Sequence, residues 1–354
     1  MSLTRDDLRA AVSVGTITEA QAASILSLSD ARRGARENLS GLDEPFELFK
    51  GFNEIFIVVG LTILYAGWAG LTGLSVLFVE NPGAQMMLYA GFSMAAVAGL
   101  AAYFTLKRRM IAPSIALSIM FAISAMQFGS SLGDVLSNQT PTVWAIASGF
   151  TGAWLFLYWA IFRVPFTLLL VAISVFGTTF TLTLVSGASL MDARQMFLLS
   201  GTGPFSILTI LLGFIGLAIA LWFDMSDPHR VTRRAQNGFW LHIIAAPAIV
   251  NTVALTLFES DTTVSLLLLT AFLALMAIFA IVIDRRSFLV AAIGYVVALA
   301  ITVIEGNAFL VILMLGAGLV FLGARWEAMR RAIMSALPEF PGKSSLPPYA
   351  KENS

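Results

Sequence analysis

From residue 51 onward, the sequence is an almost unbroken series of apolar segments, each about 20 residues long. A helix rises about 1.5 Å per residue, so roughly 20 apolar residues cross the hydrocarbon core of a bilayer. Only 12% of the residues are charged, whereas soluble domains carry roughly 25%. Inside a bilayer every backbone polar group needs a partner within the protein, which favours helices. We therefore expect an all-α, polytopic membrane helical bundle.

Short breaks of turn-forming or charged residues divide the apolar region into ten segments. Asn81-Pro82-Gly83 and Lys107-Arg108-Arg109 are two of these breaks. The predicted spans are 53–78, 83–105, 111–133, 142–162, 165–187, 203–223, 237–258, 263–283, 286–304 and 307–324. The last three are so closely spaced that the merging of two neighbours is the alternative to a count of ten.

The basic residues predict the orientation of these spans. When the N-terminus is placed inside, twenty of the 21 Lys and Arg residues fall on the inner side and only Arg194 falls outside. Such a split is the pattern of the positive-inside rule, because one miscounted helix reverses the side of every later loop. The sequence therefore predicts that both termini are cytoplasmic.

Residues 1–50 are mostly polar, and we expect a cytoplasmic helical hairpin and linker there rather than a cleavable signal peptide. Gly15 is placed to end the first short helix, since glycine is common at the C′ position. Thr18 and Gln21 have the spacing of a capping box that begins the second. The simplest role for such a hairpin is a lid that packs on the membrane domain.

Residues 51–325 form the predicted membrane domain, and residues 326–354 form a cytoplasmic tail. The tail contains four prolines, and we expect it to be mostly disordered beyond Leu337. Ten spans divide into two groups of five, which insert in opposite orientations. That is the inverted-repeat arrangement of many transporters, although the two halves share no clear residue-level similarity.

The N-terminal segment contains the pattern G-x-I-T-x-x-Q-A-x-x-I, from Gly15 to Ile25. This pattern, followed by many spans, resembles a group of bacterial membrane proteins of unknown function that begin with a short hairpin. The run from Phe239 to Pro247 is similar to stretches of such proteins. The resemblance implies a multi-pass protein of a bacterial inner membrane, and it implies no activity.

Composition excludes several classes of site. The absence of cysteine rules out disulfides, thiolate catalysis and iron–sulfur clusters, and two histidines are too few for a metal cluster. A net charge of zero provides no basic field to bind nucleic acid. We identify no catalytic, cofactor-binding or metal-binding residues, and we expect no enzymatic activity. The partners that the sequence predicts are the lipid bilayer and, for a transporter, a small-molecule solute, and protein partners stay unknown.

The segment 237–258 has the least ordinary composition. Pro247 removes an amide from the middle of the helix, which leaves a carbonyl without its usual donor. Asn251 lies one turn further on, and His242 lies nearer the inner end. These three residues are candidates to line a substrate cavity. The alternative is a kinked helix whose Asn251 bonds a neighbouring helix and whose His242 sits among the headgroups.

Three further polar residues join the candidate cavity. Gln127 is the single amide deep in span 111–133, just before a Gly129-to-Gly133 stripe of small residues that also fits close helix packing. Thr178 and Thr179 belong to the hydroxyl-rich span 165–187, although hydroxyls often bond their own helix.

Two functions remain open. The first is a transporter or facilitator of a small neutral or lipophilic solute, with a cavity near Asn251, Pro247 and Gln127. The second is a non-catalytic membrane scaffold or sensor that acts through its cytoplasmic hairpin and tail. A polar cavity at mid-depth favours the first, and a filled core with side chains bonded from helix to helix favours the second.

Overall fold

The computed structural model describes residues 52–78, 82–188, 193–199, 201, 203–228, 230, 232–260, 262–303 and 308–349, with a few positions between Leu8 and Ile25. Within these residues the secondary structure is helical, which confirms the all-α expectation. The first half contains α3 (Phe52–Val76), α4 (Pro82–Ala101), the π-helix η1 (Ala102–Lys107), α5 (Ile111–Leu136), α6 (Thr140–Phe162) and α7 (Phe166–Val185). The second half contains α8 (Ala193–Met196), α9 (Phe205–Met225), α10 (Arg233–Glu259), α11 (Thr263–Ile283), α12 (Ser287–Val303), α13 (Ala308–Ala336) and the 3₁₀ turn η3 (Lys343–Ser345).

Eight helices among the described residues are long and apolar enough to cross a membrane. They are α3, α4 with η1, α5, α6, α7, α9, α10 and α11, so the multi-pass architecture is confirmed. The last two predicted spans fall on α12, which has 17 residues, and on the first part of α13. Helix α13 continues through a polar stretch to Ala336, beyond the predicted end of its span.

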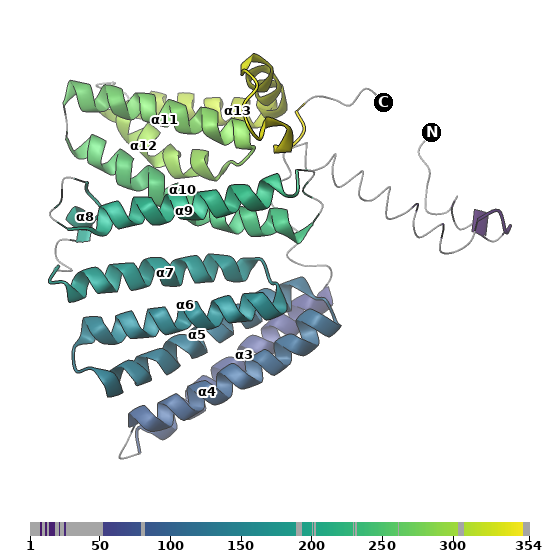
Figure 1. The fold of residues 1–354 in the computed structure, drawn as a ribbon, viewed down its shortest axis with the longest axis vertical. Helices are drawn as coiled ribbons and strands as arrows, with labels where there is room; N and C mark the ends of the chain where they lie inside the picture. The colour runs from purple at the N-terminus through teal and green to yellow at the C-terminus, as the bar shows by residue number, and fades with distance from the viewer. Residues whose placement is uncertain are drawn as a thin grey trace.

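The helices run roughly side by side, with α3–α7 in one half and α9–α13 in the other (Figure 1). One apolar core contains Leu117, Leu155 and Tyr158 from α5 and α6. A second core contains Val250 and Leu269 from α10 and α11. Helix α7 contacts α9 and α10, and it therefore joins the two halves.

Helices α5 and α6 approach each other closely where glycine permits it. A Cβ atom on Gly129 would lie 2.8 Å from Cα of Ala147, and one on Gly133 would lie 2.9 Å from the carbonyl oxygen of Val143. The small residues at 129–133 therefore form a packing face, in agreement with the simpler of the two interpretations of this stripe.

The described part of the N-terminal segment supports one element of the predicted hairpin. Gly15 has φ +74°, its amide donates to the carbonyl of Val12, and the amide of Thr16 donates to the carbonyl of Ala11. These two bonds form the Schellman motif that ends a helix. The predicted capping box at Thr18, and most of the hairpin, lie outside the described residues.

The C-terminal tail differs from the expectation of disorder beyond Leu337. Residues 338–349 turn back after α13 and contain η3. Nζ of Lys343 donates to the carbonyl of Leu337 at 2.8 Å, and Leu346 is buried. The prolines that favour disorder in isolation here provide carbonyl groups for the buried Arg330.

Candidate functional site

The candidate residues on α5 and α7 bond different neighbours. Nε2 of Gln127 donates to Sδ of Met86 on α4 at 2.6 Å. The hydroxyl of Thr178 donates to Oγ of Ser148 on α6 at 3.1 Å, and Thr179 bonds a carbonyl of its own helix. These polar groups thus bond neighbouring helices or their own helix, and the three side chains do not converge on one point.

The candidate residues on α10 also separate from one another. Pro247 is half-buried inside the helix, whereas Asn251 is exposed. The one described contact of Asn251 is its backbone carbonyl, which accepts from the Tyr295 hydroxyl of α12 at 3.3 Å. His242 is fully buried rather than among headgroups, and its partner is a carboxylate.

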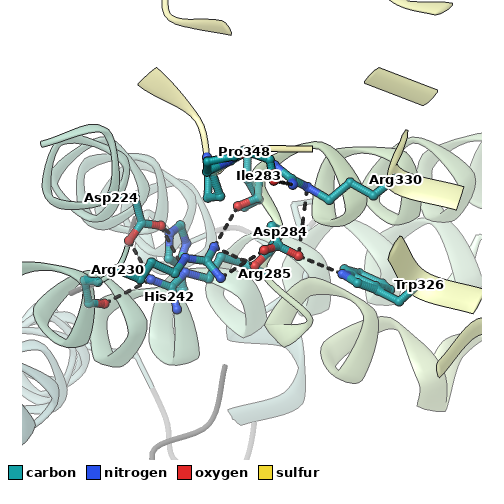
Figure 2. A network of polar contacts seen from close by, with 11 residues as sticks. Asp224, Arg230, His242, Ile283, Asp284, Arg285, Trp326, Arg330 and Pro348 are labelled. Atoms are coloured by element: carbon teal, nitrogen blue, oxygen red, sulfur yellow. Dashed lines mark hydrogen bonds and ion pairs between the residues drawn. The ribbon is translucent and has the colours of Figure 1, made fainter. Parts of the chain in front are cut away.

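That carboxylate belongs to Asp224, in the last turn of α9. Nε2 of His242 lies 2.9 Å from Oδ2 of Asp224. Arg285, between α11 and α12, donates to both carboxylate oxygens, from Nε at 3.0 Å and from Nη2 at 2.6 Å (Figure 2). An ionised carboxylate only accepts hydrogen bonds, so in this arrangement Nε2 of His242 carries the hydrogen. The two-point guanidinium contact fixes the direction of the carboxylate as well as its charge.

A second acid, Asp284, repeats this arrangement at the end of α11. It accepts from Nη1 of Arg230 at 3.0 Å and from the indole of Trp326 on α13 at 2.7 Å. Arg230, in the α9–α10 loop, also donates to the carbonyls of Ile283 and Asp284. The backbone of Asp284 has φ +58°, a left-handed conformation in which Asp and Asn are enriched.

Arg330 of α13 links the second acid to the tail. Its Nε lies 3.9 Å from Oδ1 of Asp284. Its Nη1 donates to the carbonyl of Pro348 at 3.0 Å, and its Nη2 donates to the carbonyl of Pro347 at 2.6 Å (Figure 2). The tail is therefore held through two of its backbone carbonyls. The planar guanidinium group of Arg330 has enough N–H donors to bond both carbonyls at once.

We call this group of buried residues the charge cluster. Its members are Asp224, Asp227, Arg230, His242, Asp284, Arg285, Trp326 and Arg330. With a neutral imidazole, the cluster contains three carboxylates and three guanidinium groups, so the charges balance, and the carboxylate of Asp227 accepts from the amide and the hydroxyl of Thr232. Removing a charge from water is costly unless it is paired and hydrogen-bonded. The balance explains how six charged side chains lie buried where α9, α10, α11, α13 and the tail meet.

The charge cluster is suited to holding helix ends together, and nothing in it is arranged for a metal. Within the described ranges, no three His, Asp or Glu side chains lie close enough to hold a metal ion. From the sequence, the arginines of this cluster are expected to be loop charges that set the orientation of the spans. The sequence did contain a signal for this cluster. The loops that flank 203–223, 237–258 and 263–283 carry both acidic and basic residues, whereas setting the orientation of the spans needs only basic ones.

Gly238 on α10 provides a test of how tightly the charge cluster is packed. A Cβ atom at this position would collide with Oδ1 of Asp224 and lie 3.0 Å from the carbonyl of Ala220. We expect Gly238→Ala to lower the free energy of unfolding by about 1–3 kcal/mol, since overpacking displaces the carboxylate from Arg285. The matched control is Gly216→Ala on α9, whose new Cβ would lie an ordinary 3.6 Å from Ala245. Denaturation of the two purified variants in the same detergent measures the difference, and equal stabilities would contradict a closely packed cluster.

Comparison of the chain with protein-family models found no match, and searches for similar curated proteins and solved structures found none either.

Proposed function

We propose that this chain is a multi-pass membrane scaffold or sensor that acts through its C-terminal tail. The observation that carries the proposal is the pair of hydrogen bonds that Arg330 donates to the carbonyls of Pro347 and Pro348. In this proposal the tail has two states, a held state with these two hydrogen bonds and a released state without them. The charge cluster joins Arg330 to the ends of α9, α10 and α11. A change in the packing of these helices therefore alters how firmly Arg330 binds the tail.

The interior of the first half supports a structural role for the membrane domain. Its polar side chains bond from helix to helix, as in the pairs Tyr65 with Ser124 at 2.9 Å and Trp68 with Ser93 at 2.6 Å. Thr105 also donates to Ser114 at 2.8 Å. Such bonds fix helices to one another in a medium that offers no water. This is the pattern expected of a filled core.

The distribution of basic residues supports ten spans with both ends of the chain in the cytoplasm. The α4–α5, α6–α7, α9–α10 and α11–α12 turns lie at the end of the bundle where α3 begins and α13 ends (Figure 1). These turns carry the clustered Lys and Arg residues that the positive-inside rule assigns to the cytoplasm. In this orientation the charge cluster and the tail meet the cytoplasm.

Transport of a small neutral or lipophilic solute is the alternative proposal. Five long helices on either side of α8 support it, because two five-span units insert in opposite orientations. A transport path requires polar groups that face a common space. Gln127 and Thr178 instead bond neighbouring helices, and Asn251 lies on the surface. We therefore favour the scaffold or sensor.

Replacing Arg330 with Gln tests the hold on the tail. The variant removes the paired bonds to the two proline carbonyls, and we expect trypsin to cut after Lys343 roughly tenfold faster than in the wild type. Lys343 is buried in the held state, so cleavage there reports release. Arg331→Gln is the matched control, since the neighbouring side chain is exposed and its loss leaves the tail in place. Equal cleavage rates in the two variants would show that Arg330 does not hold the tail.

Proximity labelling in intact host cells then tests whether release matters. With a labelling enzyme fused after residue 354, we expect Arg330→Gln to label a different set of neighbouring proteins from Arg331→Gln. If protease shows release while the labelled neighbours stay the same, the proposed role of the tail is wrong.

A further inference from the structure

Three consecutive cations, Lys107, Arg108 and Arg109, lie at the end of η1 and in the turn that leads to α5, and all three are exposed. None of them forms an ion pair in the part of the chain that the structure describes. They differ in this from Arg230 and Arg285, which lie at the same end of the bundle and are buried against carboxylates. The α4–α5 turn therefore holds positive charge that no ion pair among the described residues neutralises.

An open depression of about 510 Å³ lies beside this turn. Its lining is mostly apolar and aromatic, with one cation at its edge. The lining residues are Asn53, Phe56, Ile57, Tyr103, Phe104, Arg108 and Met110. The depression is therefore formed by the beginning of α3, by η1 and by the turn that follows it.

The π-helix explains why an aromatic ring lies among the cations. π-helical turns are rare and occur often at functional sites. In η1, Nζ of Lys107 and Cζ of Arg108 lie 5.8 and 5.6 Å from the centre of the Tyr103 ring. Nε of Arg108 also donates to the Tyr103 hydroxyl at 3.1 Å. These contacts hold Arg108, which lines the depression, and the neighbouring Lys107 beside the same aromatic ring.

We propose that this depression binds an anionic phospholipid, with the phosphate at Lys107, Arg108 and Arg109 and an acyl chain against Phe56, Ile57 and Phe104. The charges on the two sides are complementary, because an anionic headgroup supplies the negative charge that the turn lacks. The site lies where a membrane helix ends, which is the depth of lipid headgroups. Basic pockets at such positions are known to bind anionic headgroups. A free phosphate matches the cations but leaves the apolar wall of the depression unused, so the lipid is the better match.

Lipid retention by the full-length protein tests this site. Protein reconstituted in nanodiscs of dioleoyl phosphatidylcholine with one fifth dioleoyl phosphatidylglycerol is extracted into detergent, and the lipids that remain bound are counted by native mass spectrometry. We expect the wild type to retain phosphatidylglycerol in preference to phosphatidylcholine. Each cation near an anionic surface changes binding by roughly fivefold. The triple variant Lys107→Gln, Arg108→Gln, Arg109→Gln should therefore lower this preference at least about tenfold.

A matched variant separates a defined site from general surface charge. The control is Arg163→Gln, Arg233→Gln, Arg234→Gln, which removes three exposed cations from the same end of the bundle and none from the depression. We expect this control to keep the preference for phosphatidylglycerol. Equal loss in both triple variants would overturn the proposal, and so would an absence of preference in the wild type.

Two further measurements test the apolar wall. Ile57→Trp leaves every charge in place and fills the depression, and we expect it to lower retention of phosphatidylglycerol while the melting temperature shows that the protein is folded. Glycerol 3-phosphate, which has the anionic group without acyl chains, should not displace the lipid. Displacement by glycerol 3-phosphate at millimolar concentration would show a simple phosphate site and overturn the assignment to a lipid.

Discussion

Replacing Asp224 with Ala should destabilise the protein by about 3–5 kcal/mol, the cost of breaking a buried ion pair from one side. Asp224 is 2% exposed, and it receives both bonds from Arg285 and the contact with His242. Without it, the guanidinium of Arg285 stays buried at the junction of α9, α10 and α11 and loses the carboxylate that it bonds at two points. Its remaining described bond is to the carbonyl of Ala235, which does not offset a full charge.

The free energy of unfolding of Asp224→Ala is measured by denaturation in mixed detergent micelles, beside two further variants. Asp224→Asn keeps the shape and one acceptor oxygen, so it should fall between Ala and the wild type. Asp134→Asn removes an exposed carboxylate at the end of α5 and should change stability by less than about 0.5 kcal/mol. A loss in Asp224→Ala no larger than that of Asp134→Asn would show that the pair with Arg285 contributes little.

The membrane helices could be predicted because their signal is local. A run such as 111–133 is apolar in every turn, and its length alone matches a bilayer, so α5 was predicted without knowledge of its neighbours. The close packing of α5 on α6 was also visible, since Gly129 and Gly133 lie four residues apart on one helix face. The ends of the helices were harder to predict. The length of a polar extension, such as the last turns of α13, is not set by the thickness of the bilayer.

The charge cluster was not predictable in this way, because its pairs are distant in the sequence. Asp224 and Arg285 are 61 residues apart, and Arg230 and Asp284 are 54 residues apart. Each side chain by itself is an ordinary loop charge, and the prediction that loops are solvated is correct for most proteins. Two opposite charges near successive helix ends become a buried pair only when α9, α10 and α11 pack together.

The predicted cavity residues show the opposite error, in which a polar side chain suggests a site although local bonds already satisfy it. The hydroxyl of Thr178, which also lies near Ser148, is 2.8 Å from the carbonyl of Ser174, and Thr179 donates to that of Val175 at 2.9 Å. Both bonds lie within one helix turn. Helical periodicity indicates which residues share a face, but it gives no information about which group the neighbouring helix presents to them.

Replacing Asp284 with Ala should have an effect of similar size, about 3–5 kcal/mol, and should also loosen the tail. Asp284 is the common partner of Arg230, Trp326 and Arg330, so its loss removes the hydrogen bond to Trp326 and the ion pair with Arg330 that join the end of α11 to α13. We therefore expect both a lower free energy of unfolding and faster tryptic cleavage after Lys343. A loss of stability without faster cleavage would show that the tail is held independently of the acid.

Comparison of Asp284→Ala with Asp284→Gly separates the two roles of this residue. Both variants remove the carboxylate, but glycine adopts the φ of +58° without strain, whereas alanine at such a position costs about 1–2 kcal/mol. Asp284→Gly should therefore be more stable than Asp284→Ala by about that amount and still well below the wild type. If Asp284→Gly were as stable as the wild type, the left-handed turn alone would account for the aspartate. The ion pairs with Arg230 and Arg330 would then make no net contribution to stability, because the cost of desolvating the charges would equal the gain from pairing them.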